Sequence, residues 1–398
     1  MTETIKENKE TKKEENTQKQ EEEILLDDTR WEEILEATDG AASACFQCGT
    51  CTATCPWTLV KKDPVSVRHM IRKIQLGLQG PDEDLWLCTT CAACEEMCPR
   101  GVKISDVIKK LRRLSWKKGK VPKGMSSLMW ALYFDKNPFR LPPSEKANWA
   151  KELKIKKYTE KDEILLFIGN APSYDKRAQK TAKALVKVFG AANVKFGTLG
   201  DKEPGCGEEV LDVGLDEYVC DIVNENMKIF EDNKVHTIVT VSPHCYDIFR
   251  NHYPKGKFKV MHYTQYLKTL IDEGRLKFKK KYPYKVAFQD PCYLGRRNKE
   301  YEAPREVLRA MSGLELVELP HTKETGICCG GGGGRMFLET KAGERFSDLR
   351  IHEAADAKTQ VLATACPSCL ACLEDSTKIL PKANIKVQDL AEIAAEAV

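Results

Sequence analysis

Two short stretches of the chain, CFQCGTCTATCP at residues 45–56 and CTTCAACEEMCP at residues 88–99, carry the same cysteine pattern. In each stretch three cysteines stand at every third position, a fourth follows after three further residues, and proline comes next. Three thiolates at this spacing bind one face of an iron–sulfur cube, and the cysteine that precedes proline binds the other cube. The two stretches therefore predict a domain built around two 4Fe-4S clusters.

The spacing is that of bacterial dicluster ferredoxins, so each cluster is expected to take its fourth ligand from the other stretch. The predicted ligands are Cys45, Cys48, Cys51 and Cys98 for the first cluster and Cys88, Cys91, Cys94 and Cys55 for the second. Zinc is the alternative, because four-cysteine zinc sites also use cysteines separated by two residues. Two complete quartets that both end in Cys-Pro favour iron over zinc.

A further cysteine motif lies nearer the C-terminus and consists of Cys292, Cys328, Cys329, Cys366 and Cys369. Adjacent thiolates fit an ordinary cube poorly, and five thiolates exceed the four that a cube takes. The motif therefore indicates a less regular iron–sulfur assembly, with buried unligated thiols or zinc as the alternatives. These cysteines follow the ends of predicted strands, where α/β sheets place their ligands.

The overall composition limits the class of protein. The 398 residues are 42% hydrophobic and 31% charged, with a net charge of +4. These values are typical of a soluble globular protein and give no support for a nucleic-acid binder. No apolar run approaches the roughly 18 residues of a membrane span, and residues 1–20 lack the apolar core of a signal peptide. We therefore expect a cytoplasmic protein, in which the 17 cysteines do not form structural disulfides.

The N-terminal part of the chain divides into three predicted segments. Residues 1–28 are a charged, low-complexity tail that is expected to be disordered, with a docking tail as the alternative. Residues 29–125 form a helical domain around the two clusters, and the periodicity of their apolar residues predicts helices over Pro64–Leu78 and Ile104–Trp116. Residues 126–160 contain prolines and lysines without long periodicity and are expected to form a connector.

Residues 161–280 and 281–398 are two predicted α/β units. In both units strand-like runs alternate with amphipathic helical stretches, as in parallel sheets covered by helices. The predicted strands are Glu163–Gly169, Val235–Val241, Lys285–Gln289 and Gln360–Ala365. The expected fold class is therefore a multidomain α+β protein, with a helical dicluster domain followed by two α/β cysteine-rich repeats.

The two α/β units align with each other as an internal repeat. Three landmarks of the first unit precede their counterparts by 122, 123 and 124 residues. The pairs are Asn170 with Cys292, Gly205-Cys206-Gly207 with Cys328-Cys329-Gly330, and Ser242-Pro243-His244-Cys245 with Cys366-Pro367-Ser368-Cys369. The first copy keeps only Cys206 and Cys245, and two ligands rarely hold a cluster, so we predict no iron in that copy.

Two histidines and a run of glycines could serve the second-repeat motif. His321, the candidate catalytic residue, and His244 could each supply a proton when a thiolate leaves, the alternative for each being a loop histidine with its hydrogen bonds satisfied. Gly330–Gly334 would let the backbone approach a cluster closely and donate N–H groups to its sulfurs.

Five further residues have a predicted place but no firm role. Arg296, Arg297 and Arg335 would bind an acidic substrate or partner, or would be ordinary solvated charges. Cys220 is expected to be a buried residue of a helix core. Cys372 is expected to be a helix residue that lies near the cluster motif without belonging to it.

The two quartets, with the stretch DLWLCTTC at residues 84–91, resemble the C subunit of heterodisulfide reductase, and the repeat with its Cys-Cys-Gly resembles the B subunit. Their fusion in this order resembles the D subunit of heterodisulfide reductase and the DsrK-type subunits of the membrane complexes of sulfate reducers. The iron–sulfur subunits of glycolate and lactate oxidases share this layout. The resemblance implies a noncubane 4Fe-4S cluster on the five cysteines of the second repeat, at which a disulfide is reduced or formed.

The first repeat departs from the pattern of that family. Asn170, Gly205 and Ser242 stand where the family has cluster ligands. This departure puts in doubt a heterodisulfide reductase with two such clusters. An enzyme of the DsrK type with a single active cluster fits the sequence better.

Three functions follow from these features. In the first, electrons enter at the dicluster domain and reach the noncubane cluster, which reduces or forms a disulfide of a small molecule or a small carrier protein. In the second, the chain is the electron-transfer subunit of a flavin-dependent glycolate- or lactate-type oxidase. In the third, it is a scaffold or redox sensor without turnover.

A partner is expected to deliver the electrons. The chain shows no G-x-G-x-x-G after a strand, so neither flavin nor NAD is expected on it. By resemblance, the donor would be a membrane cytochrome b or a flavoprotein. Such a partner could hold the chain at the cytoplasmic face of the membrane.

Overall fold

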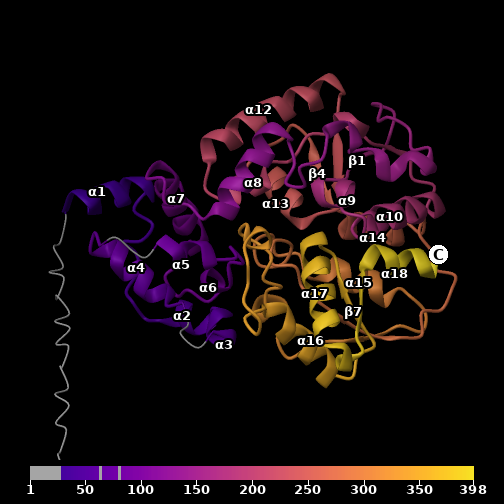
Figure 1. The fold of residues 1–398 in the computed structure, drawn as a ribbon. Coiled ribbons are helices and arrows are strands. Elements are labelled where there is room, and N and C mark those ends of the chain that lie inside the picture. Colours follow the sequence, from indigo (N-terminus) through magenta and orange to yellow (C-terminus); the bar gives the residue numbers. More distant parts are fainter. Residues whose placement is uncertain (1–27, 62–64, 79–81) are drawn as a thin grey trace, which may run out of the picture.

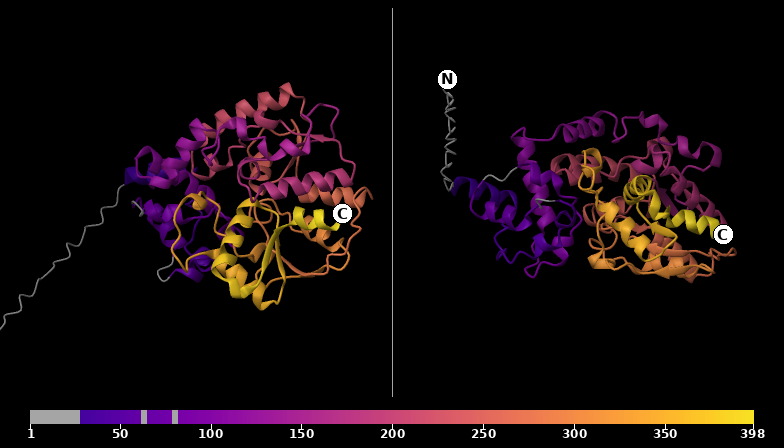
Figure 2. Two further views of the ribbon diagram at one scale, coloured as in Figure 1. Left: turned by 45° about the vertical axis from the view of Figure 1, so that its right-hand side comes forward. Right: turned by 60° about the horizontal axis from the view of Figure 1, so that its bottom comes forward.

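The computed structural model describes residues 28–61, 65–78 and 82–398. A helical lobe forms one end of the molecule, and two α/β units adjoin it and each other (Figure 1). The two further views show the same three bodies side by side (Figure 2). The tail predicted over residues 1–28 lies, apart from its last residue, outside the described residues.

The N-terminal lobe consists of seven helices within the described ranges. They are α1 (Asp28–Ala37), α2 (Thr50–Thr54), α3 (Trp57–Val60), α4 (Val67–Gln75), α5 (Asp82–Leu87), α6 (Ala93–Glu96) and α7 (Ile104–Lys117). Helices α4 and α7 occupy the two stretches in which apolar periodicity predicts helices, and they bury Met70, Ile71, Val107 and Ile108. The short helices α2 and α6 lie inside the two cysteine quartets, so each quartet is a loop followed by one helical turn.

Helix α8 (Lys123–Phe134) lies largely in the segment that the sequence predicts as a connector. Its buried residues include Met125 and Leu128, but exposed Trp130 and Phe134 stand between or beside the buried positions. With apolar residues on both faces, no helical period stands out in the sequence. The turns η1 (Pro143–Glu145) and η2 (Asn148–Leu153) complete the path to the first sheet.

The first α/β unit contains a four-stranded parallel sheet in the order β2-β1-β3-β4. Its strands are β1 (Ile164–Phe167), β2 (Phe196–Gly197), β3 (Thr237–Thr240) and β4 (Lys259–His262). The other elements are α9 (Asn170–Tyr174), α10 (Gln179–Ala191), η3 (Gly200–Lys202), α11 (Glu208–Asp212), α12 (Asp216–Asp232), α13 (Pro243–Asn251) and α14 (Tyr263–Asp272).

The second unit repeats this topology as a parallel sheet in the order β6-β5-β7-β8. Its strands are β5 (Lys285–Phe288), β6 (Glu315–Val317), β7 (Val361–Thr364) and β8 (Lys386–Asp389). The remaining elements are α15 (Glu302–Arg309), η4 (Lys323–Thr325), η5 (Arg335–Phe337), α16 (Phe346–Asp356), α17 (Pro367–Ile379), η6 (Pro381–Ala383) and α18 (Leu390–Ala397). The two matching sheets confirm the predicted fold class.

The two repeats bury a common apolar interface. Helix α10 packs on α18, and α14 packs on α15, so helices from both repeats fill the space between the sheets. The fully buried strand residues, such as Leu166 and Ala363, have apolar neighbours on both sides, as parallel sheets require. No helix in the described part of the chain is both long and apolar enough to cross a membrane.

Arg112 on α7 joins the helical lobe to both repeats. Its guanidinium is fully buried and donates to the carbonyl oxygens of Leu85 and Cys88 in the lobe at 2.7–3.1 Å. It also donates to the carbonyl oxygens of Asp212 in the first repeat, at 2.6 Å, and of Gly333 in the second, at 3.1 Å. One side chain thus satisfies backbone acceptors in all three bodies.

We predict that R112M destabilises the whole protein. The substitution leaves buried carbonyl oxygens without donors, so the free energy of unfolding should fall by at least about 3 kcal/mol. Urea unfolding of anaerobically prepared protein measures the change. The matched control is R113M, which removes a partly exposed ion pair with Glu217 and should cost at most about 1 kcal/mol. Equal losses in the two variants would contradict the assigned role of Arg112.

Candidate iron–sulfur centres

The three cysteines at the start of the first quartet lie close together. Burial raises the pKa of Cys51, and the nearby Cys45 and Cys48 raise it further. Cys98, the fourth predicted ligand, accepts a hydrogen bond at its Sγ from the amide of Val102 at 3.4 Å. Its grouping with the other three stays a prediction.

Cys55 lies with the second quartet, although it belongs to the first in sequence. Burial raises its pKa to about 12, and Cys91, Cys88 and Cys51 add to the rise. Burial likewise raises the pKa of Cys94, with further contributions from Cys88, Cys91 and Cys55. The fold therefore brings together the four cysteines that the exchange of ligands between quartets predicts for the second cluster.

The same local turn recurs in all three cysteine motifs. In each motif the backbone N–H two residues after one of the cysteines donates to the Sγ of that cysteine at 3.3–3.4 Å. The pairs are Gln47 to Cys45, Thr90 to Cys88, and Gly330 to Cys328. Such N–H donors stabilise a thiolate, the form in which cysteine binds iron.

The five cysteines of the second repeat form one buried group. Cys328 contacts Cys292 and Cys329, and these contacts and burial raise its pKa. Cys369 contacts Cys329 and Cys366, which, with burial, raise its pKa in the same way. All five side chains are less than 7% exposed. A buried set of mutually contacting thiols is costly when several ionise, unless a metal centre takes up their charge, so the set fits an iron–sulfur ligand group.

The second-repeat group directly touches the second quartet. The side chains of Cys91 and Cys328 lie within interaction distance, so predicted ligands of two different centres are in contact. Gly332 and Gly333 make this approach possible. A Cβ on Gly332 would lie 2.5 Å from the carbonyl oxygen of Thr89, and one on Gly333 would lie 2.4 Å from that of Cys88.

The role of the glycine run thus differs in part from the sequence prediction. Gly330 does donate its N–H to a cysteine sulfur. Gly332 and Gly333, however, lie against the backbone of the helical lobe, where any side chain would collide. Sequence alone could not reveal this, because the contacting backbone lies more than 200 residues away.

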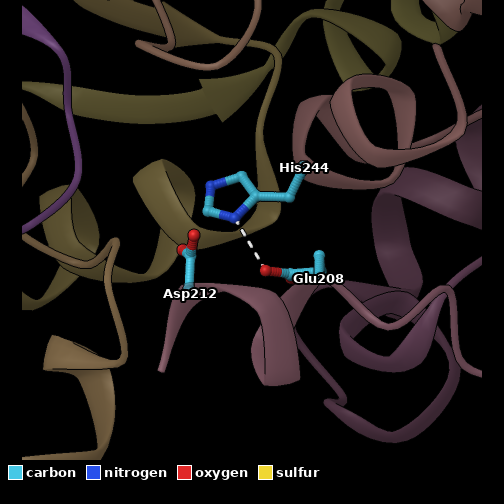
Figure 3. A group of neighbouring side chains, drawn as sticks. All are labelled: Glu208, Asp212 and His244. Carbon is cyan, nitrogen blue, oxygen red and sulfur yellow. Dashed lines mark hydrogen bonds and ion pairs between the residues drawn. The ribbon is translucent and has the colours of Figure 1, made fainter. Parts of the chain in front are cut away.

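His244, from the first repeat, reaches the cysteines of the second repeat. The imidazole is buried, stacks on Tyr293 with ring centroids 4.0 Å apart, and lies within interaction distance of Cys366. Its Nδ1 lies 3.1 Å from Glu208, and Asp212 stands beside the pair (Figure 3). Burial raises the pKa of Glu208 to about 7, although His244 opposes this shift. The structure therefore places His244 beside the cysteines of the second repeat, on helix α13 and not in a loop.

His321, the candidate catalytic residue, is not brought to the cysteines. Its side chain is about half exposed, and its imidazole pairs with Glu353 on α16. Its position seven residues before Cys328 had suggested proximity, and the turn η4 lies between the two residues. The contacts of His321 in the described chain do not support a proton donor there, and its catalytic role stays a prediction.

The arginine candidates are not solvated charges. Arg296 and Arg335 are buried, and Arg297 is partly buried against the ring of Tyr293.

Cys220 lies on α12 but is exposed, so its predicted burial was wrong. Cys372 is a residue of α17, as predicted.

The first repeat keeps a pair of thiols where the second has its cluster motif. The Sγ atoms of Cys206 and Cys245 lie 2.7 Å apart, and both side chains are buried. Asn170, which replaces a family ligand, donates its amide to Glu209 and accepts from Lys146. A polar side chain with its own partners thus stands at one of the replaced ligand positions, and the absence of iron from this copy stays a prediction.

Comparison with known domain families identifies the parts of the chain. Residues 41–102 match the 4Fe-4S dicluster domain, and residues 170–250 and 286–374 each match the cysteine-rich domain. The first match contains both quartets, and the second and third coincide with the two repeats. Each region therefore belongs to an iron–sulfur or cysteine-rich domain type that its sequence motif predicts.

Comparison with curated proteins identifies relatives of several kinds. The chain is 36% identical over 80% of its length to the probable iron-sulfur-binding oxidoreductase FadF of Bacillus subtilis, and 33% identical over 78% to EtfAB:quinone oxidoreductase of Syntrophomonas wolfei. It is 28% identical over 89% of its length to the D subunit of the dihydromethanophenazine:CoB--CoM heterodisulfide reductase of Methanosarcina barkeri.

The relatives differ in how much of their own length the chain covers. It spans 47% and 46% of the first two but 93% of the heterodisulfide reductase subunit. The fused order of one dicluster domain and two cysteine-rich domains is therefore shared over nearly the whole of that subunit. The chain is an iron–sulfur protein that is similar, over 89% of its length, to the D subunit of heterodisulfide reductase.

Proposed function

We propose that the chain is an iron–sulfur oxidoreductase that moves electrons between its dicluster domain and the second repeat, where a disulfide is reduced or formed. The observation that carries this proposal is the contact between Cys91 and Cys328, which joins a ligand of the second cluster to the five-cysteine group. When bound, two cubane clusters and one noncubane 4Fe-4S cluster would supply one-electron carriers and a centre for thiol chemistry.

The proposed ligand sets are those that the sequence predicts. Cys45, Cys48, Cys51 and Cys98 would hold one cube, Cys55, Cys88, Cys91 and Cys94 the other, and Cys292, Cys328, Cys329, Cys366 and Cys369 the noncubane cluster. The proximity of Cys55 to the second quartet supports the exchange of ligands. Five mutually contacting thiols support an assembly other than a cube, since a cube takes four.

A cavity gives a substrate access to the five-cysteine group. It has a volume of about 650 Å³, and Cys329, Gly330 and Gly331 form part of its wall. Trp57 of the helical lobe and Phe346 of α16 add an apolar surface, and their rings meet edge to face with centroids 4.8 Å apart. The space is large enough for a small thiol or disulfide, or for a cysteine-bearing end of a carrier protein.

His244 supports the proposal from the other side of the group. Its contact with Cys366 and its stacking on Tyr293 hold the ring in one orientation. A second cavity of about 290 Å³ lies between the repeats and includes His244, Glu208 and Gly331 in its wall. These residues would orient a thiol near Cys366 and exclude bulk water from it.

A second function is favoured by the identities of the relatives. FadF and EtfAB:quinone oxidoreductase, at 36% and 33%, are more similar to the chain than the heterodisulfide reductase subunit at 28%. In this function the chain carries electrons between a flavoprotein and a further acceptor, as in a flavin-dependent oxidase complex, and binds no thiol substrate. In either function we propose an electron-donor partner, a flavoprotein or a membrane cytochrome b.

We predict that thiols change the magnetic state of the second-repeat centre. Protein purified anaerobically and then oxidised should show a new EPR signal when a small thiol such as 2-mercaptoethanol is added. C366S should lose this signal, whereas C220S, which changes an exposed cysteine on α12, should keep it. The absence of any thiol-dependent signal in the native protein would favour the electron carrier without thiol chemistry.

We also predict that equivalent cysteines of the two repeats differ in their effect on iron. C329S should lose about four iron atoms per chain, because it removes a ligand of one 4Fe-4S cluster. C206S, at the matching position of the first repeat, should leave the iron content unchanged. Iron analysis of both variants measures the difference. Loss of a cluster from C206S would overturn the prediction that the first repeat holds no iron.

A further inference from the structure

Arg296 lies between the second quartet and the five-cysteine group. It follows β5 in the second repeat, and its Nε donates to the carbonyl oxygen of Cys91 in the helical lobe at 2.7 Å. Its Nη1 donates to the carbonyl oxygens of Gly326 at 2.6 Å and Glu324 at 3.3 Å. The side chain therefore spans the contact between two bodies of the protein.

The remaining nitrogen of Arg296 has no partner in the described part of the chain. Arg296 is only 4% exposed, so Nη2 is shielded from solvent, and it makes no hydrogen bond within the described residues. An unpaired N–H of a charged group is costly in a protein interior. Such an atom indicates an acceptor that the protein alone does not provide.

The charges around Arg296 are unusual for a buried guanidinium. Its strongest electrostatic neighbours in the described chain are Cys91, Cys292, Cys328 and Tyr301, and no carboxylate is among them. The cation therefore faces cysteines from two different predicted centres.

The next residue, Arg297, shows the ordinary arrangement. It also donates to the helical lobe, through the carbonyl oxygen of Thr90 at 2.9 Å, and to the Oγ of Ser105 at 2.9 Å. Its electrostatic neighbours, however, include the carboxylates of Asp247 and Asp212. Arg297 thus has carboxylates of the protein among its electrostatic neighbours.

Arg296 gains its counter-ions only when metal is bound. Arginine stays protonated, whereas burial favours the neutral form of a thiol. A cysteine that binds iron does so as a thiolate. Cys91, Cys292 and Cys328 therefore become anionic when the two centres are assembled, and every further electron adds negative charge beside the same cation.

We infer that Arg296 is the shared charge-balancing residue of the second cubane cluster and the second-repeat centre, with Nη2 donating to a sulfur of one of them. This inference rests on the proposed function, because it takes both centres as occupied. The cation and its N–H groups stabilise the reduced, more negative state of each centre, and so raise both reduction potentials. The potential of the first cluster is not affected, because Arg296 contacts none of its cysteines.

The test is an EPR-monitored redox titration of the anaerobically purified holoprotein and its variants. R296Q should lower the midpoint potentials of the second cluster and of the second-repeat centre, and should leave that of the first cluster unchanged. R296K keeps the charge without the planar donor geometry, so it should restore part of the shift. R297Q, the matched control, should shift neither potential.

Iron analysis keeps the test decisive if R296Q assembles poorly. Loss of iron from the two adjoining centres, with the first cluster and the circular dichroism spectrum retained, would support the inference. Unchanged potentials in R296Q, or equal effects of R296Q and R297Q, would overturn it.

The two proposals can fail separately. A thiol-dependent EPR signal in the native protein, with unchanged potentials in R296Q, would reject only the role of Arg296. Shifted potentials without any thiol-dependent signal would reject only the thiol chemistry.

Discussion

The buried junction of Arg112 and Asp212 holds the three bodies of this protein in one arrangement. The guanidinium donates to carbonyl oxygens of the helical lobe and of both repeats. The Asp212 carboxylate accepts from Tyr293 at 2.5 Å and from the amide of Gly333 at 3.2 Å, and pairs with Lys109 at 3.3 Å. Each charge is satisfied only when all three bodies are in place, so removing any partner leaves a buried charge or acceptor unpaired.

This junction matters because the cysteine centres lie beside it. Cys88 supplies one of the carbonyl oxygens that Arg112 binds, and Gly333 supplies another. Gly332 and Gly333 allow the backbones to approach so closely that Cys91 and Cys328 meet. If the two backbones lay further apart, more polypeptide would separate the two cysteine centres. Electron transfer between them would then be slower. The docking of the domains and the proposed electron path therefore depend on the same few contacts.

The duplication gives the protein two sheets of the same topology, but the two repeats differ in the residues at their cysteine landmarks. The second repeat keeps a full cysteine motif, and the first keeps two thiols, with Asn170, Gly205 and Ser242 at the other landmarks. The first repeat still serves the second, because it supplies His244 to Cys366 and Asp212 to the central junction. A copy that has lost its own ligands thus remains part of the site of the other copy.

The sequence by itself determined the local chemistry of this protein. Cysteine spacing predicted the two quartets and the five-cysteine group, and alternating strand and helix patterns predicted two parallel sheets, because both signals depend on residues near one another in the chain. It also identified the repeat, whose landmarks keep a nearly constant offset.

Only the tertiary structure decided which distant residues meet. His244 rather than His321 reaches the cysteines, Arg296 and Arg335 are buried rather than solvated, and Gly332 and Gly333 lie against the helical lobe. Helix α8 and the exposure of Cys220 were also missed. The physical reason is the same in each case: burial and pairing are set by domain packing, and the residues that pack together here are often 100 to 200 positions apart in the chain.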